Sequence, residues 1–229
     1  MTLPIVVKDL SFQYENDAIY ILRHLNLSVA KGEIVAIVGL SGIGKSTLCY
    51  CLSGIIPHVY GGMMEGEVLL NGKSTRDLTL PEIATNLGIV FQNPDHQLFS
   101  FTVEDEIAFG PENLCVPRDE IARRIDEVLE KVGMKEFRYA NPQQLSGGQR
   151  QLIALAAVLS LQPEILIFDE AMSQIDADGR EKIKEMMLNL RADGKTIVII
   201  EHDWENLQIA DRVLVLKGGK LEPFTGSLS

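Results

Sequence analysis

Long apolar runs are missing from this chain of 229 residues. No stretch approaches the roughly eighteen consecutive apolar residues that a membrane-spanning helix needs. The N-terminus also lacks the basic start and long apolar core of a signal peptide. We therefore expect the chain to stay in the cytoplasm, so that any contact with a membrane goes through a protein partner.

Cysteine is scarce, with three residues in the whole chain: Cys49, Cys51 and Cys115. So few cysteines do not indicate a disulfide framework. Cys49 and Cys51 are separated by a single residue, which is too tight for a common zinc pair. We expect both of them to pack in the core.

Positive charge is also limited, because 21 lysines and arginines face 32 aspartates and glutamates, a net charge of −11. Nucleic-acid partners require clustered positive charge, so this balance predicts that the chain does not bind nucleic acid. The balance does not exclude a small phosphate ligand. Charges farther than about 8 Å are largely screened at physiological salt. A lysine within 4 Å of a phosphate is worth about 4 kcal/mol at an effective dielectric constant near 20.

A phosphate-binding motif stands in the first quarter of the chain. The stretch from Gly39 to Thr47 reads G-L-S-G-I-G-K-S-T and follows the apolar run Ile34 to Val38. This is the P-loop pattern in its strand–loop–helix context, which argues against a chance glycine-rich turn. Backbone N–H groups and the following helix N-terminus would surround phosphates. We expect Lys45 to reach the β- and γ-phosphates and Ser46 to ligate Mg²⁺ through its hydroxyl.

Polar residues end three further apolar strands, and ligands of open α/β sheets bind at the carboxyl ends of strands. Asp169 and Glu170 follow one strand, where we expect Asp169 to hold Mg²⁺ and Glu170 to polarise the attacking water. Because successive strand residues point to opposite sides, we expect the two carboxylates to face different directions. Gln92 and His202 end the other two strands. Either of them is a site residue or an ordinary structural residue on this pattern alone.

The middle of the chain, from Asn93 to Gln162, changes to helical patterns. Thr102 predicts a helix N-cap, and the acids Glu104, Asp105 and Glu106 fit its first turn better than a metal site. An amphipathic helix is expected from Pro117 to Val132.

A second glycine-rich turn precedes another helix. Ser146, Gly147, Gly148 and Gln149 lie there, where a hydroxyl, free N–H groups and the helix dipole converge. This is either a second phosphate clamp or only a capped helix. Near the N-terminus, within a β-rich opening, Tyr14 either stacks on an adenine ring or packs as an ordinary strand end.

These motifs, in this order, resemble the ATP-binding subunits of ABC transporters over essentially the whole chain. The Leu-Ser-Gly-Gly-Gln sequence at 145–149 is the most specific feature, because it stands between the P-loop (Walker A, Gly39 to Thr47) and the acidic strand end (Walker B, Ile165 to Glu170). The resemblance implies an α/β fold: a P-loop NTPase, RecA-like core with an antiparallel β subdomain and an inserted α-helical subdomain. It assigns residues 1–93 and 163–229 to the core and 94–162 to the helical subdomain of a single domain.

The resemblance also implies ATP and Mg²⁺ as cofactors and a head-to-tail dimer of two ATPase protomers, identical or different. Glu170 becomes the catalytic base, His202 the γ-phosphate contact and Gln92 the metal and water sensor. The implied metal ligands are Ser46, Gln92 and Asp169. Asp176, in the loop from Ser173, would communicate across the dimer. The implied nucleotide-binding residues are Tyr14, Gly39, Ser41, Gly42, Gly44, Lys45, Ser46, Thr47, Ser146, Gly147, Gly148, Gln149 and Asp176.

A finer resemblance lies in the segment from Phe91 to Phe99, which is similar to energy-coupling factor transporter ATPases that drive uptake of vitamins, cobalt or nickel. It implies a peripheral subunit at the cytoplasmic face of the membrane, contacting an integral membrane coupling protein through the region from Gln92 to Phe101. Two features depart from these resemblances. Ala171-Met172 stands where ABC ATPases often have proline and threonine, and the C-terminal extension of many stand-alone energy-coupling factor ATPases is missing. The missing extension is compatible with three alternatives: the chain is half of a tandem protein, a trimmed chain or a short variant.

The sequence thus predicts an ATP-hydrolysing motor subunit of a membrane transporter, of the energy-coupling factor type. A conventional ABC importer or exporter subunit would use the same chemistry with a different partner. A soluble ABC ATPase outside transport would need long inserts, basic surfaces or a second cassette, and none is visible in this sequence.

Overall fold

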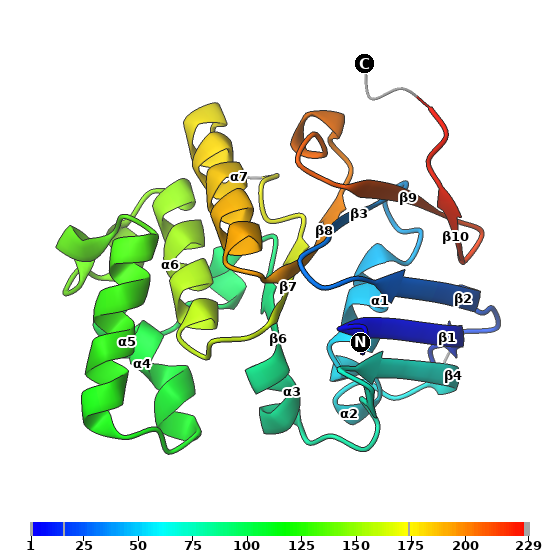
Figure 1. The fold of residues 1–229 in the computed structure, drawn as a ribbon, viewed down its shortest axis with the longest axis horizontal. Coiled ribbons are helices and arrows are strands. Elements are labelled where there is room, and N and C mark those ends of the chain that lie inside the picture. Colours follow the sequence, from blue (N-terminus) through cyan, green and yellow to red (C-terminus); the bar gives the residue numbers. More distant parts are fainter. Residues whose placement is uncertain (1, 16, 174, 227–229) are drawn as a thin grey trace.

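The protein is described by a computed structural model that covers residues 2–15, 17–173 and 175–226. These residues form two sheets and a group of helices (Figure 1). The antiparallel sheet lies at the right of Figure 1, and helices α4, α5 and α6 gather at the left.

The smaller sheet is antiparallel and has the strand order β2-β1-β4-β5. Its inward residues alternate with exposed ones in β2, as expected for a sheet with one buried face. Asn71 and Gly72 both have positive φ and form the tight turn between the last two strands. The strands are β1 (Ile5–Gln13), β2 (Leu22–Val29), β4 (Met63–Leu70) and β5 (Lys73–Ser74).

The larger sheet has the order β10-β9-β3-β8-β7-β6, and all of its pairs are parallel except β10 with β9. Its three central strands are buried along their whole length, which explains their continuous apolar sequences. The strands are β3 (Ile34–Val38), β6 (Leu87–Val90), β7 (Ile165–Asp169), β8 (Thr196–Glu201), β9 (Arg212–Lys217) and β10 (Lys220–Pro223).

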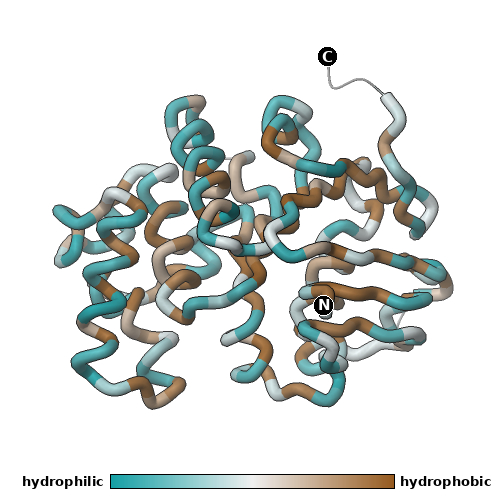
Figure 2. The backbone as a smooth tube through the Cα atoms, in the orientation of Figure 1, coloured by the Kyte–Doolittle hydropathy of each residue, from teal (hydrophilic) through white to brown (hydrophobic). Residues whose placement is uncertain are grey.

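Helices cover both faces of the larger sheet. One apolar cluster joins one face to α4–α7, and a second joins the other face to α1 and the antiparallel sheet. Figure 2 shows hydrophobic residues along the central strands and hydrophilic ones over much of α5 and α7. The helices are α1 (Lys45–Leu52), α2 (Ile55–His58), α3 (Leu80–Asn86), α4 (Val103–Asn113), α5 (Arg118–Lys131), α6 (Gly147–Leu159) and α7 (Ala177–Ala192).

The predicted fold class is confirmed, including the helical character of the middle of the chain. Thr102 caps α4 by accepting a hydrogen bond from the Asp105 N–H. The predicted amphipathic helix is α5. Cys49 and Cys51 are buried on α1, and both thiols are free.

Two short helices were not predicted. The segment after α1 contains α2. Helix α3 begins at a capping box in which Thr79 and Glu82 satisfy each other's backbone N–H groups, a pattern that the sequence does carry. Within the described residues, no helix combines the length and apolar character needed to cross a membrane.

Candidate nucleotide site

The P-loop connects the end of β3 to the start of α1, as the sequence predicts. Gly44 stands at the N-cap of α1 with φ of 108°, a conformation that favours glycine. At Gly39 a Cβ atom would lie 2.8 Å from the Leu216 carbonyl oxygen, so this position admits no side chain without movement. These glycines allow the loop to curl tightly against β9.

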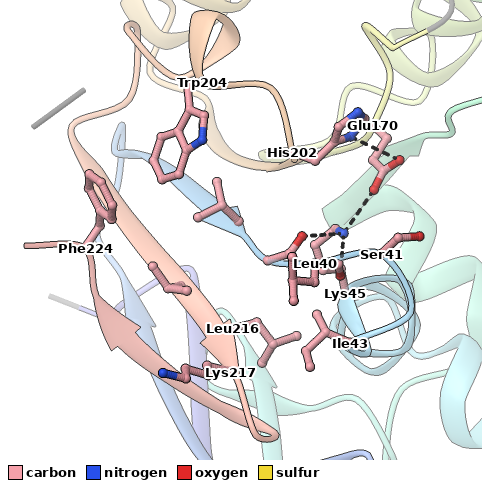
Figure 3. Close-up of a pocket in the computed structure, with 13 residues that line it drawn as sticks. Leu40, Ser41, Ile43, Lys45, Glu170, His202, Trp204, Leu216, Lys217 and Phe224 are labelled. Carbon is pink, nitrogen blue, oxygen red and sulfur yellow. Dashed lines mark hydrogen bonds and ion pairs between the residues drawn. The ribbon is translucent and has the colours of Figure 1, made fainter. Parts of the chain in front are cut away.

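Lys45 points back into the loop. Its side chain is 5% exposed, and its ammonium donates hydrogen bonds to the carbonyl oxygens of Gly39 (3.0 Å) and Leu40 (3.2 Å). The same ammonium lies 3.3 Å from the Glu170 carboxylate (Figure 3). A buried cation therefore stands at the mouth of the loop, beside the acids of β7.

Asp169 ends β7 next to α1. Its carboxylate lies beside the Ser46 hydroxyl, and its side chain is largely buried. Burial, followed by the charge of Glu170, raises the pKa of Asp169 to about 6, although Ser46 and Lys45 oppose the rise. A carboxylate that is costly to keep ionised is suited to a cation.

Glu170 corrects one prediction about direction. The two carboxylates were expected to face opposite sides, but Glu170 has φ of 51° and leaves the strand conformation. Its N–H still donates to the Ile200 carbonyl at 2.8 Å. Its carboxylate consequently turns to Lys45, so both acids lie at the P-loop.

Gln92 and His202 join the same site from neighbouring strands. The Gln92 amide donates to the Ser173 hydroxyl at 3.1 Å, and that hydroxyl donates to the Glu170 carbonyl at 2.8 Å. The His202 ring lies 3.6 Å from the other Glu170 oxygen and is about half exposed. Glu170 is thus connected to Lys45, His202 and, through Ser173, to Gln92.

The P-loop, Gln92 and both acids line one cavity of about 270 Å³, whereas His202 lines an adjoining hollow instead. The cavity brings the P-loop together with Gln92 and both acids of β7. Its lining residues are Ile21, Ser41, Gly42, Gly44, Lys45, Ser46, Thr47, Gln92, Asp169 and Glu170.

Tyr14 lies beside the P-loop helix. Its hydroxyl forms a 3.2 Å hydrogen bond with the Thr47 hydroxyl, and its ring packs edge-on against Phe12. Tyr14 also lines a separate shallow cavity with Gly62 and Met63. Its ring is therefore held close to the P-loop with one side facing open space.

The glycine-rich turn at 146–149 lies apart from the P-loop cavity. Ser146 caps α6 by accepting from the Gln149 N–H at 3.3 Å, and the Gln149 side chain returns a bond to the Ser146 N–H. Asp176 caps α7 and accepts from the Gly179 N–H at 2.9 Å. Ser146, Gly148, Gln149 and Asp176 line a second cavity of about 590 Å³. Gln174, between Ser173 and Asp176, is outside the described residues.

An apolar hollow adjoins the P-loop on the side of β9 and β10 and was not predicted from the sequence. Figure 3 shows Trp204 and Phe224 facing it across from Leu216, with Lys45, Glu170 and His202 at its edge. The two aromatic rings have centroids 4.6 Å apart. Trp204 is the single tryptophan of the chain, and its position two residues after His202 was the available signal.

Comparison with known proteins places this architecture in a family. The family model described as ABC transporter matches residues 22–173. An ABC transporter ATP-binding protein of Pyrococcus horikoshii is 44% identical over 219 residues, which are 95% of this chain and 77% of that protein. The energy-coupling factor transporter ATP-binding protein EcfA of Methanosarcina acetivorans is 43% identical, covering 94% of this chain and 77% of that protein.

A solved structure agrees with these sequence matches. The cbiO1 protein of Clostridium perfringens, described as part of the ABC transporter complex cbiONQ, superposes with a TM-score of 0.86 at 31% identity. The superposition covers 97% of this chain and 88% of that one. Some relatives are much longer: one ATP-binding protein of Methanosarcina acetivorans is matched over only 34% of its length. The P-loop chemistry, the family match and the shared fold together show that this chain belongs to the ATP-binding proteins of ABC transporters, which are ATPases.

Proposed function

We propose that the chain is the ATP-hydrolysing motor subunit of an energy-coupling factor transporter that imports a vitamin or a transition-metal ion. The similarity to EcfA, whose name describes an energy-coupling factor transporter, supports this assignment, together with the similarity to cbiO1, which is described as part of an ABC transporter complex. A conventional ABC importer or exporter subunit remains the alternative and differs in its membrane partner.

The triphosphate of ATP would lie in the P-loop cavity. The N–H groups of Ser41, Gly42 and Gly44, together with the N-terminus of α1, supply positive potential there. The Lys45 ammonium would exchange its carbonyl partners for phosphate oxygens. Tyr14, held by Thr47 beside the loop, would stack on the adenine.

The oxygen groups around Ser46 fit Mg²⁺, which prefers hard oxygen ligands. Ser46, Gln92 and Asp169 line one cavity, and burial raises the pKa of the Asp169 carboxyl, so a cation bound there would stabilise its ionised form. When bound, Mg²⁺ would neutralise the charge that develops on the phosphates.

Glu170 would orient and polarise the water that attacks the γ-phosphate. Its two oxygens already contact Lys45 and His202, so the carboxylate is held at the mouth of the P-loop. His202 would donate a hydrogen bond to the γ-phosphate. Gln92, connected to Glu170 through Ser173, would sense whether the γ-phosphate is bound. This convergence of contacts on Glu170 is the observation that carries the proposal.

A second protomer would complete the site. Ser146, Gly147 and Gly148 present a helix N-terminus and N–H groups suited to a phosphate, but the cavity that Ser146 and Gly148 line is distinct from that of the P-loop. A head-to-tail dimer would place the turn of one protomer over the ATP of the other, with Gln149 and Asp176 beside it. We assign residues 94–162 to the helical subdomain that carries this turn and 1–93 with 163–229 to the core.

The segment from Gln92 to Phe101 would contact a membrane protein, so that the subunit lies at the cytoplasmic face. Phe99 and Phe101 are 62% and 85% exposed, which is unusual for large apolar side chains. The buried Glu106 carboxylate fixes the backbone just before Phe101 by accepting from the N–H groups of Phe99 (2.9 Å) and Ser100 (2.7 Å). The pair therefore forms a fixed apolar projection.

Co-purification from membranes tests this function. We expect the tagged chain to retain a small membrane scaffold protein, and Phe101→Asp to lose it. Leu188→Asp on α7, which also changes an exposed apolar residue, is the matched control and should retain the partner. Retention of a dedicated permease would favour the conventional transporter, and salt-sensitive binding to DNA or ribosomes would favour a function outside transport.

A further inference from the structure

A buried acid that the site described above does not use stands directly before His202. Glu201 ends β8, the strand between β3 and β7, and its side chain is fully buried. It shares a face of the strand with Ile197 and Ile199, which pack in the core with α6 and α7. A carboxyl group thus occupies a position where its neighbours on the same face are isoleucines.

The Glu201 carboxyl group is folded back onto the turn that follows it. One oxygen accepts a hydrogen bond from the His202 N–H at 3.2 Å, and the Asp203 N–H lies near the same carboxyl group. The other oxygen is buried without a partner. The group therefore holds the backbone of His202, where the turn begins.

Burial of such a group has a free-energy cost that an apolar side chain would avoid. Burial accordingly raises the pKa of Glu201, and the N–H groups of His202 and Asp203 only partly oppose that rise. Packing alone does not account for an acid here, since the two isoleucines on the same face fill equivalent space.

The same turn is fastened on its other side by the Asp203 side chain. Asp203 accepts from the Glu205 N–H at 3.1 Å and forms an ion pair with Arg180 of α7 at 3.3 Å. His202, between the two anchors, has a half-exposed ring that reaches Glu170 at 3.6 Å. The backbone of His202 is fixed while its ring stays free to meet a ligand.

We propose that Glu201 is a positioning residue for ATP hydrolysis: its buried carboxyl group holds the His202 turn so that the imidazole faces Glu170 and the γ-phosphate. The inference rests on the role proposed for His202. It predicts an effect on turnover that depends on the imidazole, with little effect on ATP affinity.

A double-mutant cycle with Glu201→Met and His202→Ala tests this role on the full-length chain, with phosphate release and unfolding both measured. We expect Glu201→Met to lower kcat at least tenfold, with KM for ATP changed less than threefold. Glu201→Gln, whose amide oxygen still accepts a hydrogen bond from the turn, should retain most of the wild-type kcat. In the His202→Ala background, Glu201→Met should cause no further loss.

Ile199→Ala, on the same face of β8, is the control for a purely structural effect. It should lower the melting temperature without the loss of kcat. Two outcomes would overturn the role of Glu201. In the first, Glu201→Met and Ile199→Ala lose the same fraction of kcat at equal stability. In the second, the losses of Glu201→Met and His202→Ala multiply in the double variant. If Glu201→Met does not fold, Glu201→Asp takes its place in the same cycle. Wild-type chain that releases no phosphate would contradict the proposed function itself, whereas normal wild-type turnover with multiplying losses contradicts only this inference.

Discussion

The Lys45 ammonium and the Glu170 carboxylate lie 3.3 Å apart, with side chains 5% and 20% exposed. Among the described residues, neither Lys45 nor Glu170 forms an ion pair with another lysine, arginine, aspartate or glutamate. Glu170 also contacts the His202 ring, which is charged only when protonated. The pair therefore places a cation for a phosphate and an anion for a water molecule side by side. Each of the following predictions tests a consequence of that arrangement or of the fold that holds it.

Lys45→Met should weaken ATP binding at least about a hundredfold. The lysine contributes about 4 kcal/mol of attraction at 4 Å from a phosphate at an effective dielectric near 20, and a hundredfold corresponds to about 2.7 kcal/mol. Isothermal titration with ATP measures the change. Lys217→Met removes an exposed charge from nearby β9 and should leave the affinity within threefold. Similar losses in both variants would show that only the general positive charge of this region matters.

Asp169 should make the protein less stable as the pH rises through 6. Its folded-state pKa of about 6 exceeds the ordinary value of 3.8, so ionisation costs the folded state up to about 3 kcal/mol above pH 6. Asp169→Asn removes this cost. In urea unfolding with EDTA, the stability gained by the variant should grow by more than about 1 kcal/mol from pH 5 to pH 8. A gain that is constant over this range would contradict the raised pKa.

Gly88→Ala should destabilise the contact between β6 and α6. An added Cβ would lie 2.2 Å from a methyl carbon of Val158, and overpacking of this kind costs about 1–3 kcal/mol. Val158→Ala removes the clashing methyl group. We therefore expect the double variant to be at least about 1 kcal/mol more stable than the sum of the two single-variant losses in unfolding free energy predicts, as measured by urea unfolding. Strict additivity would show that the contact is looser than described.

Mixing two inactive variants tests the proposed head-to-tail dimer. Lys45→Met disables the P-loop, and Ser146→Arg places a bulky charge in the glycine-rich turn. A mixed head-to-tail dimer contains one site with both defects and one with neither. Phosphate release should therefore recover in the mixture to as much as about a quarter of the wild-type rate. No recovery, or activity of Ser146→Arg alone, would argue that the two motifs do not meet across an interface.

The parts of this site that follow local rules could be predicted from the sequence. Lys45, Ser46 and Asp169 lie where a strand–loop–helix pattern and a strand end place them, and the α/β architecture follows from buried central strands. Helix α3 carried a readable signal in Thr79 and Glu82 that the apolar pattern obscured.

Other features depend on tertiary contacts and carry no local signal. Glu170 turns toward Lys45 because it adopts a positive φ while its N–H bonds to Ile200 of the neighbouring strand. Ser173 connects Gln92 to Glu170 only once the loop after β7 has folded. Strand alternation, which ignores such contacts, predicted the wrong direction for the second acid. The burial of Glu201 likewise depends on the strands on both sides of β8.

Glu170→Gln gives the most direct test of the central claim, that a carboxylate held beside Lys45 drives hydrolysis of bound ATP. ATP affinity and phosphate release should be measured on the same preparation, with Glu222→Gln on exposed β10 as control. We predict an ATP affinity within threefold of wild type, a dimer that persists with ATP, and a rate lowered at least about a hundredfold. Normal phosphate release by Glu170→Gln would contradict the account.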